Sequence, residues 1–246
     1  MLVRRGLSPS LSRPDLPFPP GFSKEAEERL AARLDHYAFR LFLRGAILKG
    51  GAFRAEDPTD YLSLAKAREA CQDLVDLGLA RLQGDGRYRL RFRAANFGGT
   101  LEWWVARELR RRLGFEVASG VRSGAPGVGG DLDVVATAEG RLLYVELKSS
   151  PPKHLTPEEV GAFLRRVRAV RPDLSVFAMD TALRLSDKVL PMFAQALGKQ
   201  HRAERLAREN FRLAPHLYAV NAKQDFLENL RLAIANGLRE LAPPAP

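Results

Sequence analysis

The spacing of hydrophobic residues divides the chain into a helical first part and a second part in which helices and strands alternate. From about Ser23, an amphipathic pattern runs through EAEERLAARLDHYAFRLFLRGAIL and ends at Gly50, which predicts one long helix. After the short, turn-like DPTDYL, Ser63 can cap a further helix and Gly78 can end it. The sequence LARLQGDGRYRLRF then alternates on both sides of a Gly-Asp-Gly turn, which predicts a two-stranded hairpin.

This order of helices and hairpin, over residues 23–93, resembles a winged helix-turn-helix domain. The resemblance implies that the helix beginning at Ser63 is a recognition helix for DNA and that the hairpin is a wing. The side chains that would then contact DNA are Lys66, Arg68 and Gln72 on the helix and Arg81, Arg87 and Arg89 on the wing. The alternative is a module that packs against a partner or against the rest of the chain.

Residues 94–100, AANFGGT, break the periodicity and are expected to link this domain to a second one over residues 101–241. Strands are expected at FEVASGVRS, LSVFAMDT and HLYAVNA, with a hairpin between the first two. Helices are expected at LEWWVARELRRRLG, PEEVGAFLRRVRAV, SDKVLPMFAQALG, HRAERLARENFR and DFLENLRLAIANGLRE. In the fourth of these helices, Glu204 would pair with Arg208 one turn later. The alternation predicts an α/β sheet with helices on its faces.

The two ends of the chain are expected to lie outside these domains. Residues 1–22 are rich in proline and read as an extended or disordered arm, and residues 242–246, APPAP, read as a disordered tail. The first residues are basic but lack the apolar stretch of a secretory signal, and no run approaches the roughly 18 apolar residues of a membrane span. We therefore expect a cytoplasmic protein with no membrane partner.

Charge points to a polyanionic partner. Lys and Arg outnumber Asp and Glu by 39 to 29, which gives a formal charge of +10 and an isoelectric point near 10.2. Nucleic acid is the first candidate, and a solvated, arginine-rich surface is the alternative. Cys71 is the single cysteine, so neither a disulfide within the chain nor a cysteine-ligated zinc site is expected. The four histidines are scattered without metal-ligand spacing.

The segment GGDLDVVATAEGRLLYVELKSS places acidic residues in an otherwise apolar hairpin. A two-residue turn at Glu139-Gly140 would set Asp133 opposite Glu146 and Asp131 opposite Lys148. These four side chains would share one face with Val135 and Tyr144. The other face would be apolar and would belong to the core: Leu132, Val134, Ala136, Leu143, Val145 and Leu147.

Two opposed carboxylates repel each other, but a cation between them reverses that penalty. Mg²⁺ prefers oxygen ligands and is usually held by one or two carboxylates plus substrate phosphate. Asp133, Glu146 and the backbone carbonyl of Leu147 therefore form a candidate Mg²⁺ (or Mn²⁺) site. Lys148 would lie beside the metal, where an ammonium can orient or help to deprotonate the attacking water and offset charge on the phosphate.

This D-x12-E-x-K pattern at a hairpin, after a helix that bears a glutamate, resembles the PD-(D/E)xK nuclease superfamily of restriction-endonuclease-like folds. Its RecB-like and Holliday-junction-resolvase-like branches are the most similar. The resemblance covers about residues 97–180 and implies a mixed sheet flanked by helices. It also implies that Asp133 and Glu146 are metal ligands, that Lys148 is the catalytic lysine, and that Glu102 is the glutamate of the preceding helix.

The pattern departs from the family in one place. The proline of the family's name is absent, and Asp131 adds a second acid. We favour Asp133 as the ligand because it precedes Val134-Val135 and would oppose Glu146, while Asp131 could pair with Lys148 instead. The alternative to a catalytic site is a solvated ladder of ion pairs.

The sequence therefore predicts a metal-dependent DNA endonuclease whose winged helix positions the DNA. A second hypothesis is a non-catalytic DNA-binding or regulatory protein, since this fold also has members that do not cleave. An RNA-processing nuclease is a third. Many relatives of the fold cut duplexes as dimers, so a homodimer stays open.

Overall fold

The computed structural model of the chain describes residues 1–12, 15–125, 129–198 and 202–242. It divides into two compact units, Pro14–Trp104 and the combination of Met1–Arg13 with Val105–Pro246. The expected linker at 94–100 does not coincide with the boundary between the units, which follows Trp104. Helix α4 (Gly98–Leu113) begins inside residues 94–100, and Phe97 is buried. Part of the glycine-rich loop before Asp131 (126–128) and most of the expected tail (243–246) lie outside the described residues.

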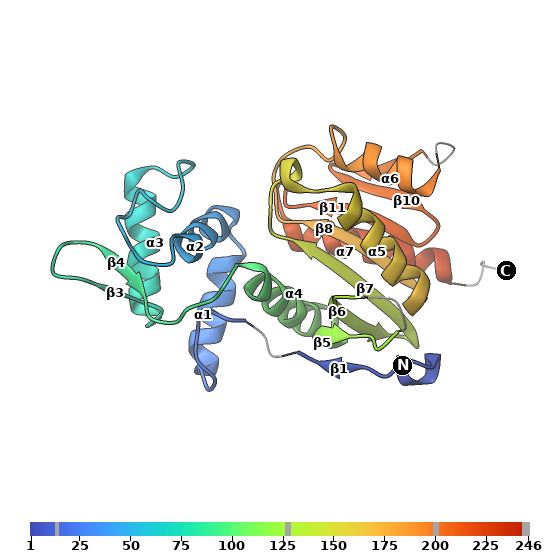
Figure 1. Cartoon of the computed structure of the whole chain (residues 1–246), viewed down its shortest axis with the longest axis horizontal. Coiled ribbons are helices and arrows are strands. Elements are labelled where there is room, and N and C mark those ends of the chain that lie inside the picture. The colour runs from blue at the N-terminus through green and yellow to red at the C-terminus, as the bar shows by residue number, and fades with distance from the viewer. Residues whose placement is uncertain (13–14, 126–128, 199–201, 243–246) are drawn as a thin grey trace. The chain divides into compact units, whose positions relative to one another are not determined.

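The described part of the N-terminal unit contains helices α1, α2 and α3, the start of α4, and a small antiparallel sheet with strand order β2-β4-β3 (Figure 1). Its elements are α1 (Lys24–Leu34), α2 (Tyr37–Lys49), β2 (Ala52–Phe53), α3 (Leu64–Asp76), β3 (Ala80–Leu82) and β4 (Tyr88–Leu90). As the sequence predicts, the Ser63 side chain accepts a hydrogen bond from the backbone of Lys66 at the start of α3, and Gly78 has a φ of +71° just beyond its end.

The single long helix expected from Ser23 onward is wrong, because the chain forms two helices with a break at Asp35 and His36. The buried guanidinium of Arg40 donates hydrogen bonds to the carbonyls of Leu34 at 2.5 Å and Asp35 at 3.2 Å. These carbonyls lie at the end of α1, where the last turn of a helix has no hydrogen-bond donors of its own for them. The amphipathic period continues across the break, so the pattern does not reveal it.

The second unit is built on an eight-stranded mixed sheet with the order β1-β5-β6-β7-β8-β11-β10-β9. Strands β7, β8 and β11 are parallel neighbours, and the other pairs are antiparallel. The strands are β1 (Ser10–Leu11), β5 (Glu116–Arg122), β6 (Asp131–Ala138), β7 (Arg141–Lys148), β8 (Leu174–Met179), β9 (Glu204–Ala207), β10 (Asn210–Ala214) and β11 (Leu217–Asn221). The predicted α/β fold, a mixed sheet flanked by helices, is therefore confirmed.

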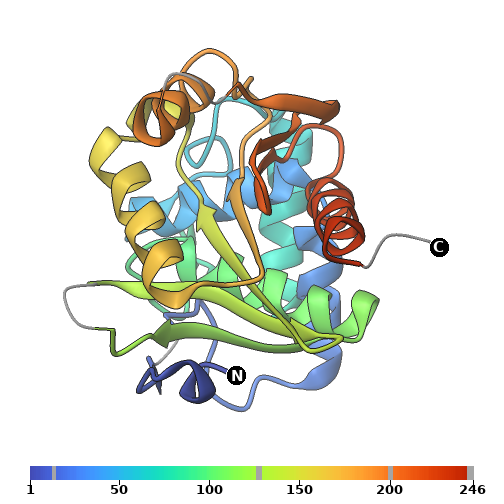
Figure 2. The ribbon, with the colours of Figure 1, turned by 90° about the vertical axis from the view of Figure 1, so that its right-hand side faces the viewer.

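Helices cover both faces of this sheet (Figure 2). Helices α5 (Pro157–Val170) and α6 (Val189–Leu197) pack on one face, where Phe163, Phe177 and Phe193 form an aromatic cluster. Helix α7 (Phe226–Leu241) lies on the other face, against β8 and β11. No helix in the described part of the chain is long and apolar enough to cross a membrane.

The N-terminal arm is extended at Ser10–Leu11, where it adds to the sheet as strand β1 beside β5. It also contains a short 3₁₀ helix, η1 (Val3–Arg5). This segment is ordered because the side chains of Leu2 and Leu7 are buried in the core of the second unit.

The charged helix expected at HRAERLARENFR is wrong, because the described residues of this stretch form strands β9 and β10. Arg208, with a φ of +52°, lies in the turn between them. In a strand, Phe211 and Leu213 point to the same face and both reach the core, which a helix would not allow. Glu204 consequently lies across from Arg212, at 3.5 Å, instead of pairing with Arg208.

Candidate active site

The hairpin that carries the candidate residues has the predicted register near its turn. Glu139 and Gly140 have φ values of +52° and +72°, as a two-residue turn of type I′ requires. The paired residues run from Ala138–Arg141 through Val135–Tyr144 to Val134–Val145. Turn chemistry therefore sets which side chains share a face.

Beyond Val134, the two strands pair with their outer neighbours. Strand β6 continues beside β5 as far as the pair of Asp131 with Arg122, and β7 continues beside β8 as far as the pair of Lys148 with Met179. The Asp133 carboxylate accepts a hydrogen bond from the backbone N–H of Leu147 at 2.6 Å. Asp133 thus reaches across to the residue between Glu146 and Lys148.

The two aspartates have different neighbours. The Asp131 carboxylate lies 3.3 Å from the guanidinium of Arg122, on β5. The alternative in which Asp131 pairs with Lys148 is therefore wrong, because Lys148 lies 3.1 Å from Glu146 and 3.3 Å from Glu159 of helix α5. Asp133 is the aspartate that lies beside the E-x-K segment.

Glu146 is buried, with 2% of its side chain exposed, and is surrounded by donors. The guanidinium of Arg166, on helix α5, donates to both carboxylate oxygens at 2.7 and 2.8 Å. The hydroxyl of Tyr144 also donates to Glu146 and accepts a hydrogen bond from Arg166 at 2.9 Å. We refer to Tyr144, Glu146, Lys148 and Arg166 as the Glu146 cluster.

Helix α5 covers the face of the hairpin that carries Tyr144 and Glu146. Tyr144 packs against Phe163 of α5, with ring centroids 5.6 Å apart, and Val135 is also buried on this side. Sequence reasoning missed Arg166 and Glu159, which lie in LRRVRAVR and PEEV on the next helix. The only available signal was the amphipathic period of that helix, which places Arg166 one turn after Phe163.

Burial and charge act in opposite directions on Lys148. Burial alone would lower the pKa of its ammonium, but the carboxylate of Glu146, with smaller contributions from Asp133 and Glu159, raises the pKa overall. Burial, together with the nearby charge of Glu146, raises the pKa of the Tyr144 hydroxyl well above its usual range. Lys148 therefore stays a cation and Tyr144 a neutral donor near neutral pH.

The donor types of the predicted metal site suit a hard divalent cation, but the arrangement around Glu146 does not leave its oxygens open. Among the described residues, no group of three or more His, Cys, Asp or Glu side chains is placed to hold a metal ion. The cations on Glu146 are the guanidinium of Arg166 and the ammonium of Lys148. A metal held by Asp133, Glu146 and the Leu147 carbonyl would require Arg166 to release at least one Glu146 oxygen.

Glu102 lies on the part of α4 that belongs to the N-terminal unit, where it is half-buried. Its part in the site stays a prediction. Another glutamate of the same helix, Glu108, is buried in the second unit.

Three arginines of helix α4 surround Glu108: Arg107 at 2.6 Å, Arg111 at 2.8 Å and Arg112 at 2.7 Å. Burial alone would raise the pKa of Glu108, but hydrogen bonds from these arginines lower it overall. We refer to these four residues as the Glu108 cluster. Three of the four arginines of the basic stretch RELRRR therefore contact a glutamate of their own helix.

The predicted DNA-contacting residues of the N-terminal unit are all exposed. Arg68 and Gln72 lie one turn apart on the same face of α3, whereas Lys66 lies on another face. On the hairpin, Arg81 and Arg89 are directly opposed across strands β3 and β4. Like charges that lie directly opposite each other destabilise a sheet. Arg87 lies 3.5 Å from Asp85 at the turn.

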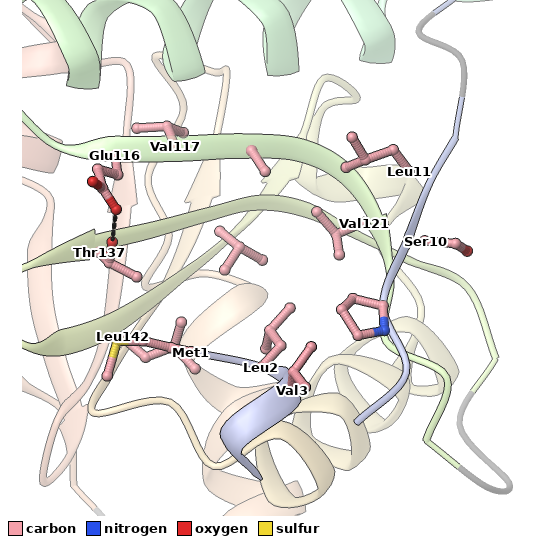
Figure 3. A pocket seen from close by; sticks show the side chains of 13 residues that line it. Met1, Leu2, Val3, Ser10, Leu11, Glu116, Val117, Val121, Thr137 and Leu142 are labelled. Carbon is pink, nitrogen blue, oxygen red and sulfur yellow. Dashed lines mark hydrogen bonds between the residues drawn. The ribbon is translucent and has the colours of Figure 1, made fainter. Parts of the chain in front are cut away.

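A separate cavity of about 390 Å³ lies between the N-terminal segment and strands β5 to β7 (Figure 3). Its lining is largely apolar and includes Leu2, Val121 and Leu142, with a hydrogen bond of 3.3 Å from Thr137 to Glu116 at one end. None of the described residues that line it is basic, so it does not suit phosphate.

No family model matches the sequence, and neither does any curated protein. The fold is similar to two solved structures. Protein VC1899 from Vibrio cholerae is 14% identical, with a TM-score of 0.56, and the match covers 98% of this chain and 60% of that one. Can2 from Sulfobacillus thermosulfidooxidans, solved in complex with cyclic tetra-adenylate, is 15% identical, with a TM-score of 0.53, and the match covers 94% of this chain and 58% of that one. The chain thus spans about three-fifths of each of these structures, and the likeness concerns the fold.

Proposed function

We propose that the protein is a metal-dependent nuclease that hydrolyses phosphodiester bonds in DNA. The observation that carries the proposal is that Asp133, Glu146 and Lys148 lie close together at the point where β6 and β7 separate. Two carboxylates and a lysine in this arrangement provide ligands for Mg²⁺ or Mn²⁺ and a cation beside the reacting phosphate.

A bound metal would supply an activated water and polarise the phosphate. Asp133, Glu146 and the backbone carbonyl of Leu147 are the residues that would hold it. Because Lys148 stays protonated, its role is to offset charge that develops on the phosphate and to orient the attacking water. Arg166 would move from Glu146 toward the substrate or toward solvent when the metal binds.

The N-terminal unit would hold the DNA. Arg68 and Gln72 of α3, with Lys66 in its first turn, and the opposed pair Arg81 and Arg89 on the hairpin support this part of the proposal. Phosphate contacts from such residues position a nucleic acid, whereas base contacts would select its sequence. Arg87 would add a contact at the tip of the hairpin. Light scattering would measure the mass of the complex with duplex DNA and so distinguish a monomer from a homodimer.

One observation favours a second function, a non-catalytic DNA-binding or regulatory protein. The guanidinium of Arg166 already neutralises Glu146 through two hydrogen bonds, and a scaffold needs no metal. Under this alternative the Glu146 cluster is a permanent ion-pair network that joins β7 to α5.

The deciding experiment incubates the purified protein with labelled single-stranded, duplex and branched DNA and with RNA. Each reaction contains Mg²⁺, Mn²⁺ or EDTA, and Glu146→Ala and Lys148→Ala variants are run beside the unchanged chain. Arg165→Ala, an exposed arginine of α5, is the matched control. We expect metal-dependent cutting of DNA that falls by about 10²-fold or more in both site variants. Binding without cutting on every substrate would favour the scaffold.

A further inference from the structure

The second unit has a basic cavity at one edge of its sheet. Strands β7, β8 and β11 are parallel and end in register, since Met179 pairs with both Lys148 and Asn221. The segments that follow these strands therefore leave the sheet at the same edge. Ligands of open α/β sheets commonly bind at this carboxyl edge.

A cavity of about 560 Å³ lies among these segments. Pro152 and Lys153, which belong to the 3₁₀ helix η2 (Pro152–His154), line it after β7. Residues from the segment between β8 and α6 and from the segment after β11 complete the lining: Ala182, Leu183, Arg184, Asp187, Lys188 and Lys223. Four of the lining residues are cations and one is an anion.

The positive charge of this cavity is only partly offset within its lining, where Asp187 is the one carboxylate among the described residues. Among the described residues, no carboxylate forms an ion pair with Lys153, Arg184, Lys188 or Lys223. This differs from the basic stretch of α4, where Glu108 engages three arginines. Four cations and one carboxylate around one cavity leave a positive potential that an anionic ligand can compensate.

The cavity wall is also held in place. The Lys188 ammonium donates to the carbonyl of Lys153 at 2.8 Å, which leaves further donors of the same ammonium for a ligand. The carbonyl of Leu183 accepts a hydrogen bond from the Asn221 side chain at 2.7 Å, and Glu209 accepts one from the backbone of Leu185 at 2.9 Å. A wall fixed in this way loses little entropy when a ligand binds.

The chemistry of the lining indicates the ligand. Lysine and arginine side chains on three adjacent segments match a row of phosphates better than a single anion. Leu183, with 58% of its surface exposed, offers an apolar contact for a sugar or a base beside those phosphates. We infer that this cavity, which we call the carboxyl-edge cavity, binds consecutive phosphodiesters of a nucleic-acid strand. Its role as a substrate site rests on the proposed nuclease function, but binding itself does not.

The test measures binding in EDTA, so that no cutting occurs. A labelled single strand of DNA is titrated with the unchanged chain and with the triple variant Lys153→Ala, Arg184→Ala, Lys223→Ala, and the anisotropy is followed over a range of salt concentrations. Each lost phosphate contact lowers the salt slope by about 0.7 for a single strand. We expect a slope smaller by about 2 and an affinity lower by about a hundredfold near 0.1 M salt.

The control removes the same charge elsewhere in the second unit. Arg165, Arg168 and Arg239 are exposed and do not line the cavity, so a triple variant that changes all three to alanine should leave affinity and slope close to the unchanged values. Thermal melting of both variants checks that they are folded. Single-stranded RNA, duplex DNA and cyclic tetra-adenylate are titrated in parallel to identify the source of the phosphodiesters.

If the cavity variant loses affinity for any of these ligands and the control variant does not, the inference is supported. Equal losses in the two variants, no loss in either, or no binding to any of the ligands would overturn it. These outcomes are separate from the fate of the proposed function, because Glu146→Ala can abolish cutting without changing binding in EDTA.

Discussion

Glu108 and Glu146 are equally buried, each with 2% of its side chain exposed, and each is surrounded by cations. The partners of Glu108 all come from its own helix, at positions one, three and four residues away. The partners of Glu146 come from two elements, strand β7 and helix α5, and Arg166 lies 20 residues further along the chain.

The comparison shows that similar burial can have different origins and uses. The Glu108 cluster forms wherever helix α4 forms, so it neutralises charge without joining elements. The Glu146 cluster exists only after α5 has packed on the sheet, and it reaches the surface through Lys148 and Glu159, which are 20% and 38% exposed. The second arrangement therefore depends on packing between a strand and a helix, and the first does not.

The largest expected effect is on stability, when Arg166 is changed to methionine. Removing one partner of a buried ion pair costs about 3–5 kcal/mol of unfolding free energy, and because Lys148 still contacts Glu146 we expect the lower end of this range, about 3 kcal/mol. Denaturant unfolding in EDTA measures this loss, with Arg168→Met on the exposed face of the same helix as the control. If Mg²⁺ restores part of the loss, the metal is occupying the position that Arg166 left. A loss below about 1 kcal/mol would show that Glu146 does not depend on Arg166.

A smaller effect is expected for Glu108→Gln. Because the pKa of Glu108 is lowered by its arginines, its carboxylate stabilises the folded chain fully above the unfolded pKa of about 4.3. That contribution is lost as the pH falls through the lower folded value. The variant should be less stable by about 1–2 kcal/mol at neutral pH, and the difference should shrink below about pH 4. Unfolding followed across this range is the measurement, and a constant difference at every pH would contradict the lowered pKa.

The smallest effect is expected for Arg111→Met. Arg111 is 57% exposed, and Glu108 keeps Arg107 and Arg112 when it is lost. The unfolding free energy should fall by less than about 1 kcal/mol, as for most exposed ion pairs. A loss as large as that of Arg166→Met would mean that the two clusters do not differ in the way described above.

The same contrast explains what the sequence could predict. The hairpin register from the turn to the pair of Val134 with Val145 follows from local turn chemistry at Glu139-Gly140, and the α3 cap follows from Ser63, so both are confirmed. Arg166 was not predictable as a partner of Glu146, because the packing of α5 on β7 decides this contact. The β9–β10 hairpin was missed for a similar reason, since its charged residues favour a helix locally and the core selects a strand through Phe211 and Leu213.

The most direct test of the account compares Glu108→Gln with Glu146→Gln in the same cleavage assay with Mg²⁺. Both variants remove one buried carboxylate charge, but only Glu146 lies beside Asp133 and Lys148. We predict that Glu108→Gln cuts DNA at close to the unchanged rate and that Glu146→Gln loses about 10²-fold or more. Equal rates in the two variants, whether both high or both low while folded, would contradict the assignment of Glu146 to the active site.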